Sequence, residues 1–203
     1  MAYEIVVVGT SWGGLHALGI LVGGLPASLR TPVVIVQHRS RGHDSLLAEL
    51  LTQQTSFPVH DAEDKESLAT GHIYLAPPDY HLLVERGYVS LTTDPLVRFS
   101  RPSIDVTFES AADSYGAAVI GVILTGANDD GAAGLARIAG RRGYAIVQDP
   151  ATAESPIMPA AAERAVPHAQ ILPLEQIAPR VAALTAEVPH STRPVGRRTQ
   201  ASP

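Results

Sequence analysis

The sequence predicts a doubly wound α/β fold, with a mostly parallel sheet, helices on both faces and an antiparallel hairpin at one edge. Its apolar runs, such as residues 5–8 and 33–36, consist of Val and Ile without polar alternation. That pattern is typical of strands buried on both faces, as in parallel sheets covered by helices. Segments with helical patterning separate these runs, which favours right-handed strand-helix-strand crossovers.

The order of the elements supports this fold class. Gly9 is expected to end the first strand, and Ser103 is expected to cap the helix that starts at residue 104. Glu85, Arg86 and Gly87 separate two short extended segments, which predicts a hairpin with glycine in its turn. The predicted strands are 5–8, 33–36, 73–75, 80–84, 88–92, 119–124 and 145–147, the predicted helices are 13–22, 45–53, 104–115 and 131–141, and shorter elements are predicted at 159–164, 170–172 and 174–184.

Length and composition limit the possible functions. The 203 residues fit one domain at 1–188, followed by a basic, proline-rich tail at 189–203 that we expect to be disordered. The absence of cysteine excludes disulfides and a thiol nucleophile. The net charge of -5 argues against nucleic acid as a partner. There is no basic, apolar leader and no apolar run of roughly 20 residues, so we expect a cytoplasmic protein without membrane insertion.

Three polar residues follow three of the predicted buried strands. Ser11 follows the first strand, His38 the second, and Asp130 the run at 119–124. Because parallel strands bring their carboxyl ends to one edge of the sheet, we expect the three side chains to converge there. A hydroxyl, an imidazole base and an orienting carboxylate are the parts of a serine-hydrolase triad.

The sequence around Ser11 fits a strand-turn-helix nucleophile elbow, in which small residues permit a sharp turn. The backbone N–H of Trp12 is the candidate oxyanion donor, and the turn that contains Ala127 is a candidate source of a second donor. Glycine-rich turns of this kind also bind phosphates, and an aspartate before a helix is often only a cap. The triad prediction therefore depends on all three residues meeting at one edge.

Several separated motifs resemble the catalytic domain of the chemoreceptor protein-glutamate methylesterases, the CheB type. The resemblance extends over most of residues 4–185. The matching segments are Gly-Thr-Ser-Trp-Gly-Gly at 9–14, Val-Gln-His at 36–38, Ile-Tyr-Leu-Ala-Pro-Pro-Asp-Tyr-His at 73–81, Ser-Arg-Pro-Ser-Ile-Asp-Val-Thr-Phe at 100–108, Ile-Leu-Thr-Gly at 123–126 and Asp-Gly-Ala-Ala-Gly at 130–134.

The resemblance implies hydrolysis of glutamyl methyl esters on the cytoplasmic helices of methylated chemoreceptors, with glutamine deamidation in some members, and no cofactor. It implies that Ser11 is the nucleophile, His38 the base and Asp130 the orienting acid. It also makes Arg101 a candidate contact for acidic receptor helices. His81 follows the Ala-Pro-Pro-Asp loop at 76–79 and is a second substrate-binding candidate from its place in the sequence.

The chain departs from the family pattern at three places. Trp12 stands where members commonly have a small or hydroxyl residue, and Ala127 stands where they commonly have methionine. Both flank the predicted oxyanion site, so they bear on substrate choice. The N-terminal receiver domain of the best-known members is not found before the first strand. We therefore expect the site to be constitutively open or controlled by a separate regulatory protein.

Four other functions compete with this hypothesis. A nucleotide-binding domain would need Gly-x-Gly-x-x-Gly in the first turn, which the sequence lacks. An α/β-hydrolase would use Ser11, Asp130 and His168 in that chain order. A catalytically silent interaction module of the same fold and an esterase for another ester are further alternatives. The histidines show no compact ligand spacing, so we expect no metal site.

Overall fold

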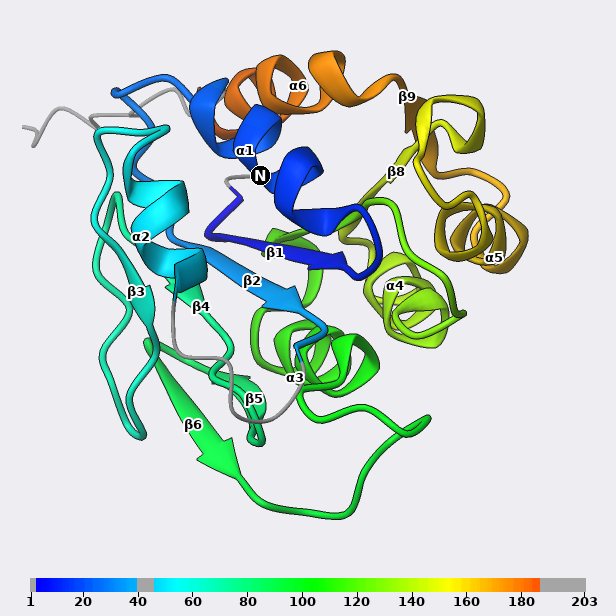
Figure 1. Ribbon diagram of the computed structural model, residues 1–203. Coiled ribbons are helices and arrows are strands. Elements are labelled where there is room, and N and C mark those ends of the chain that lie inside the picture. Colours follow the sequence, from blue (N-terminus) through cyan, green and yellow to red (C-terminus); the bar gives the residue numbers. More distant parts are fainter. Residues whose placement is uncertain (1–2, 40–45, 187–203) are drawn as a thin grey trace, which may run out of the picture.

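The computed structural model describes residues 3–39 and 46–186, and the predicted tail at 189–203 lies outside the described residues. The described chain forms a seven-stranded parallel sheet with helices on both faces (Figure 1). The elements are β1 (Ile5–Thr10), α1 (Gly14–Gly23), β2 (Val33–Gln37), α2 (Leu46–Thr52), β3 (Val59–Asp61), β4 (Ile73–Leu75), β5 (His81–Glu85), β6 (Tyr88–Thr92), α3 (Ile104–Tyr115), η1 (Gly116–Ala118), β7 (Val119–Ile123), α4 (Ala132–Gly140), β8 (Tyr144–Gln148), η2 (Pro150–Thr152), α5 (Ile157–Ala165), β9 (Gln170–Leu172) and α6 (Leu174–Ala186).

The strand order β3-β4-β2-β1-β7-β8-β9 is that of a doubly wound sheet. The chain builds one half outward from β1 through β2, and the other half outward through β7. The switch between the two halves therefore lies at β1, which pairs in parallel with both β2 and β7. In open α/β sheets, ligands bind beyond the carboxyl ends of the strands at such a switch point.

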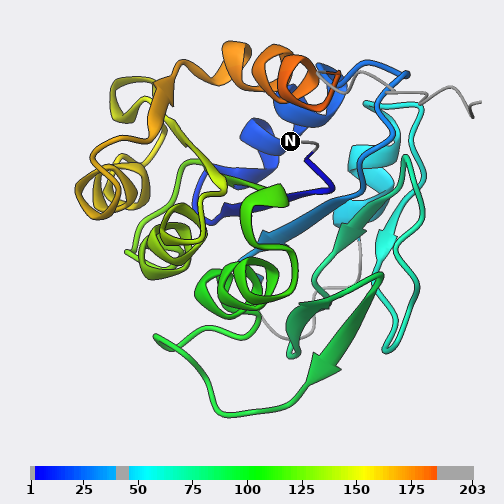
Figure 2. The same ribbon diagram turned by 180° about the vertical axis from the view of Figure 1, so that it is seen from behind.

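Two apolar cores cover the two faces of the sheet. Alternate residues of the strands face opposite sides, so Val6 and Val8 pack with α1, α2 and α6, whereas Ile5 and Val7 pack with α3, α4 and α5. Figures 1 and 2 show these two groups of helices from opposite sides. Every residue of β1 is buried, which agrees with the prediction from its apolar run.

The predicted fold class is confirmed, and the hairpin is present at the predicted residues. However, β5 and β6 form a two-stranded sheet of their own and do not extend an edge of the main sheet. The hairpin is held instead by α3, whose Ser110 hydroxyl accepts a hydrogen bond from the Val84 N–H. Thr107 of α3 also donates to the Leu82 carbonyl.

Two local predictions differ from the structure. β1 continues through Gly9, where an added Cβ would lie 2.3 Å from a methyl group of Ile104. Gly9 thus permits close packing of α3 and does not end the strand. Ser103 precedes α3 as expected, but its side chain makes no capping bond and instead donates to Asp130. The three-residue strand β3 has too short an apolar pattern to be predicted.

Candidate active site

Ser11 lies in a sharp turn between β1 and α1. Its backbone N–H donates to the Thr125 carbonyl beyond β7 at 3.0 Å, and its carbonyl accepts from Gly14 at 2.9 Å. Gly13 adopts a left-handed conformation with φ of 77°, and an added Cβ at Gly14 would overlap the Gln37 side chain. The glycines therefore permit the turn that places the Ser11 hydroxyl in front of α1.

His38 immediately follows β2 and reaches both other residues of the predicted triad. Its Nδ1 lies 3.2 Å from the Ser11 Oγ, and its Nε2 lies 2.7 Å from an Asp130 carboxylate oxygen. Because an ionised carboxylate only accepts, the network assigns the ring proton to Nε2 and leaves Nδ1 to accept from the hydroxyl. Serine proteases use the two ring nitrogens the other way round.

Asp130 is fully buried and accepts four hydrogen bonds. Besides His38, its donors are the Ser103 hydroxyl at 2.9 Å and the backbone N–H groups of Ile104 and Asp105 at 2.7 and 3.0 Å. Burial alone raises the pKa of Asp130, but the hydrogen bonds from His38 and from the start of α3 outweigh it and lower the pKa overall. The carboxylate is therefore held ionised where it can orient the imidazole.

Asp105 makes the reciprocal contact at the start of α4. One of its carboxylate oxygens accepts from the N–H groups of Gly131 and Gly134 at 2.9 and 2.7 Å. Burial, together with the negative charge of Asp130, raises the pKa of Asp105. Arg98 offsets part of that cost, because its Nε lies 3.2 Å from the other Asp105 oxygen. The two acids thus cap each other's helices.

The candidate oxyanion donors, the backbone N–H groups of Trp12 and Ala127, flank Ser11. Neither donates to another residue within the described ranges 3–39 and 46–186. α1 begins two residues after Trp12, so its positive end faces the same space. Their role as oxyanion donors stays a prediction.

Two clefts that contain polar side chains share His38 as a lining residue. The first, of about 540 Å³, is lined by Ser11, Trp12, Gly13, Gly14, Leu15, His16, Gln37, His38, Ala127 and Glu154. The second, of about 370 Å³, is lined by His38, Arg39, Asp79, Leu96, Phe99, Ser100, Arg101 and Pro102. The Trp12 side chain is 67% exposed, so it forms a wall of the first cleft and is not a core filler.

The two substrate-binding candidates lie in different places. Arg101 lines the second cleft, where it donates to Asp79 at 2.7 Å and to the carbonyls of Thr93 and Asp94. His81 is only 1% exposed and lines neither cleft. Its Nε2 lies 3.1 Å from the Pro95 carbonyl, and its Nδ1 accepts from the Ser103 N–H. The structure therefore places His81 under the start of α3, outside both clefts.

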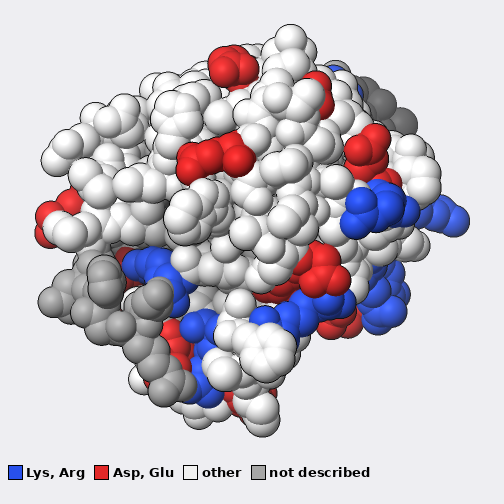
Figure 3. Space-filling model, turned by 45° about the vertical axis from the view of Figure 1, so that its right-hand side comes forward, with Lys and Arg blue, Asp and Glu red and all other residues white. Residues whose placement is uncertain are grey.

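Figure 3 shows basic and acidic side chains interleaved over the lower part of one face, whereas the upper part carries scattered acidic side chains among uncharged ones. Several ion pairs lie around the second cleft. They include Arg39 with Asp61, Arg98 with Asp129 and Arg101 with Asp79. The last two of these pairs hold the loop between β6 and α3 against the rest of the domain.

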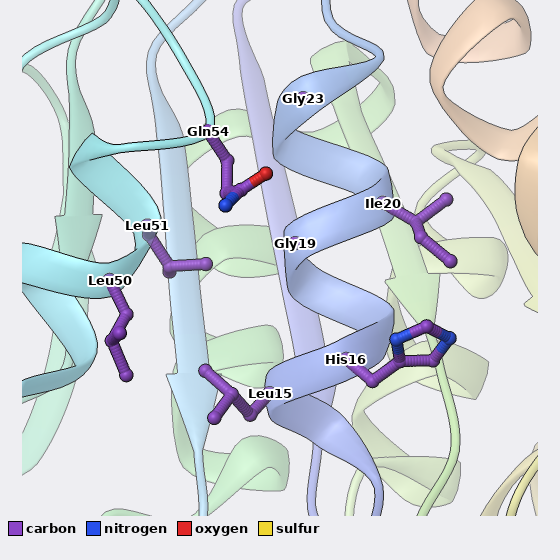
Figure 4. Close-up of a pocket in the computed structure, with 8 residues that line it drawn as sticks. All are labelled: Leu15, His16, Gly19, Ile20, Gly23, Leu50, Leu51 and Gln54. Atoms are coloured by element: carbon purple, nitrogen blue, oxygen red, sulfur yellow. The ribbon is translucent and has the colours of Figure 1, made fainter.

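An apolar groove between α1 and α2 reaches the same end of the molecule (Figure 4). It has a volume of about 520 Å³, and Leu15 and His16 line both this groove and the first cleft. In Figure 4, Leu15 lies toward the arrowhead of β2, whereas Gly23 lies at the far end. The groove lining carries no carboxylate, so it adds apolar surface and no acid to the site.

The sequence did not predict the residues that hold Ser11, His38 and Asp130 in position. Gln37 donates through Nε2 to the carbonyls of Ser11 and His38, at 2.8 and 3.1 Å, which ties the two loops together. Asp105 is the other missed residue, because nothing near it in the sequence indicates that it caps α4. Gln37 could have been found from the sequence, because it is a polar residue at the end of an apolar strand.

The alternative base is excluded by topology. His168 is exposed and precedes β9, so it lies at the amino ends of the parallel strands, opposite Ser11. Within the described part of the chain, no group of three or more His, Asp or Glu side chains is placed to hold a metal ion. No helix among those residues is long and apolar enough to cross a membrane.

A parallel α/β domain with a hydroxyl, an imidazole and a carboxylate linked in series at its strand ends has the build of a serine hydrolase. A family model described as CheB methylesterase matches residues 6–181. The chain therefore belongs to the CheB methylesterase family, a family of carboxylic ester hydrolases.

Individual relatives agree with this membership. A Leptospira interrogans protein, provisionally named protein-glutamate methylesterase/protein-glutamine glutaminase, is 45% identical over 179 residues, covering 88% of this chain and 93% of that protein. The protein-glutamate methylesterase/protein-glutamine glutaminase of Trichodesmium erythraeum is 38% identical, covering 88% of this chain and 52% of that protein. The crystal structure of the Thermotoga maritima CheB methylesterase catalytic domain superposes with a TM-score of 0.85 at 32% identity, covering 91% of this chain and 100% of that one.

Proposed function

We propose that this chain is a serine hydrolase that removes methyl groups from glutamyl methyl esters of chemoreceptor cytoplasmic helices. The observation that carries the proposal is the series from the Ser11 hydroxyl to His38 at 3.2 Å and from His38 to Asp130 at 2.7 Å. The names of its relatives supply the ester and its protein setting. Such receptors place the reaction in the cytoplasm.

The proposed reaction proceeds through an acyl-enzyme. The Ser11 Oγ attacks the ester carbonyl carbon while the Nδ1 of His38 takes the hydroxyl proton. The N–H groups of Trp12 and Ala127 hold the resulting oxyanion. The C–O bond to the methoxy group breaks as His38 returns the proton, and methanol leaves. Water then attacks the acyl carbon while His38 takes one of its protons. The bond from the acyl carbon to the Ser11 Oγ breaks as His38 returns that proton to Oγ, and the glutamic acid product ionises to the carboxylate.

The same groups suit deamidation of glutamine, with ammonia leaving in place of methanol. The second activity in the names of the relatives supports this extension. We also propose that a separate regulatory protein controls the activity. The two clefts lined by His38 open outward, so a second protein that covered them would block access to the site.

Substitution of the nucleophile tests the proposal. Ser11→Ala should lower methanol release from methylated receptor preparations by about a thousandfold or more, because the acyl-enzyme cannot form. Ser114→Ala is the matched control, since Ser114 lies on α3 and donates only to the Val84 carbonyl of the hairpin. Full activity of Ser11→Ala would show that another residue is the nucleophile.

Two further outcomes separate the alternatives. Labelling of the wild-type chain by a fluorophosphonate, lost in Ser11→Ala, would exclude a catalytically silent module. Hydrolysis of small esters without methanol release from methylated receptors would indicate an esterase for another substrate.

A further inference from the structure

A tight turn in the loop between β6 and α3 carries an exposed aromatic side chain in an unfavourable conformation. Val97 and Ser100 exchange both backbone hydrogen bonds, at 3.1 and 2.8 Å. The two residues between them, Arg98 and Phe99, have φ of 48° and 63°. Two positive φ values are typical of a type I′ turn, which favours Asn followed by Gly. A bulky residue such as Phe is strained there.

Packing within the domain does not explain the choice of Phe99. Its side chain is 98% exposed, so it buries almost no apolar surface that would offset the backbone strain. The turn is nevertheless held in place, because Arg98 pairs with Asp129 at 2.6 Å and with Asp105 at 3.2 Å. The fold thus fixes an exposed aromatic ring at a defined position and gains no burial from it.

That position is beside the reacting pair. Phe99 and the half-exposed Leu96 line the second cleft, which includes His38. Trp12 and the half-exposed Leu15 line the first cleft, which includes both Ser11 and His38. Large apolar side chains therefore line both of the clefts that share His38, with most or half of their surface open to a partner.

We propose that Phe99, presented by the turn at 97–100, is a docking anchor for the polypeptide that carries the scissile ester, with Trp12 as the opposing wall. The inference rests on the proposed function and names the part of the substrate that this surface recognises. The occupant is a substrate segment with an apolar side chain beside the esterified residue. A methyl ester is too small to fill both clefts, whereas a polypeptide that places its ester at Ser11 extends past His38, which lines both of them.

The test compares a protein ester with a small ester in one assay. Methanol release is measured with a methylated chemoreceptor cytoplasmic fragment and with N-acetylglutamate γ-methyl ester. Phe99→Gly should lower the ratio of kcat/KM for the protein to kcat/KM for the small ester by about fivefold or more, as for an aromatic anchor of an interface. Its thermal midpoint should be equal to or above that of the wild type, because glycine adopts a positive φ freely.

Arg142→Gly is the matched control. Arg142 is exposed, has φ of 68° and lies in the turn after α4, at the amino end of β8 and therefore at the opposite edge of the sheet. This substitution relieves the same kind of strain but should leave the ratio unchanged.

Two results would overturn the inference. One is an unchanged ratio in Phe99→Gly, and the other is a lower thermal midpoint, which would show that the ring stabilises the fold. If the wild-type chain released methanol from neither substrate, the proposed function itself would fail, and that result is distinct from an active enzyme with an unchanged ratio.

Discussion

Asp130 combines two tasks in one side chain, because it both orients His38 and accepts the first N–H groups of α3. Sequence reasoning set a catalytic role against a simple capping role for this residue. The structure shows that it contacts His38 and also caps a helix, so that capping does not rule out the proposed catalytic role. The helix that it caps is α3, not the α4 that follows it in the chain. The hydrogen bonds that cap α3 also lower the pKa of the carboxyl, which favours the charged form beside the imidazole.

Asp130→Asn should therefore damage activity and stability together. The amide keeps the shape but loses the charge and introduces an N–H₂ group where four donors converge. We expect kcat for a small ester to fall by about a thousandfold or more, as for a triad with its acid replaced. The thermal midpoint should also fall, because buried donors are left without an acceptor.

Asp113→Asn is the control for Asp130→Asn, since Asp113 is an exposed partner of Arg137 and Arg141 on the outside of the domain. Asp113→Asn should change neither kcat for the small ester nor the thermal midpoint appreciably, because exposed ion pairs contribute little to stability. Wild-type kcat in Asp130→Asn would remove the orienting role from the proposed mechanism.

At the scale of elements, α3 and α4 exchange caps through Asp105 and Asp130. The sequence predicted both helices and the strand-end positions of Ser11, His38 and Asp130, because apolar runs and the residues after them are local features. It did not predict this exchange, since the two acids are far apart in the chain and meet only when the helices pack. Gly9 was misread for the same reason, because its neighbour Ile104 belongs to α3.

The exchange leads to a pH-dependent prediction for Asp105→Asn. Asparagine can still accept from Gly131 and Gly134, so the substitution mainly removes the charge. Burial and the charge of Asp130 raise the folded-state pKa of Asp105 above its ordinary value of 3.8. A carboxyl with a raised pKa costs the folded state stability as the pH rises through that pKa. The stability of Asp105→Asn relative to the wild type should therefore increase from about pH 4 to about pH 7.

Urea unfolding at the two pH values measures this difference. The other charged groups that face Asp105, namely Arg98, Asp130 and, through Asp130, His38, are present in both proteins and so largely cancel. The free energy of unfolding of Asp105→Asn minus that of the wild type is the quantity compared. If it stayed constant or decreased as the pH rose, the raised pKa of Asp105 would be contradicted.

At the scale of the whole molecule, the site is built on the centre of the sheet. Ser11, His38 and Asp130 follow β1, β2 and β7, which are adjacent strands. These strands belong to both apolar cores, since alternate residues of each face opposite sides. Their buried residues have almost no exposed surface, in contrast to the less buried edge strand β9.

The central position predicts that activity is lost only when the whole domain unfolds. Local opening requires little free energy where few apolar contacts are broken, and approaches the global value in buried central strands. In a urea titration, the midpoint for small-ester hydrolysis, assayed at the same urea concentration, should coincide with the midpoint from far-UV circular dichroism. Loss of activity at clearly lower urea, after correction for any rapid inhibition by urea itself, would mean that the turn after β1 or the residues after β2 open independently. The convergence of the three side chains would then depend on the loops more than on the three central strands.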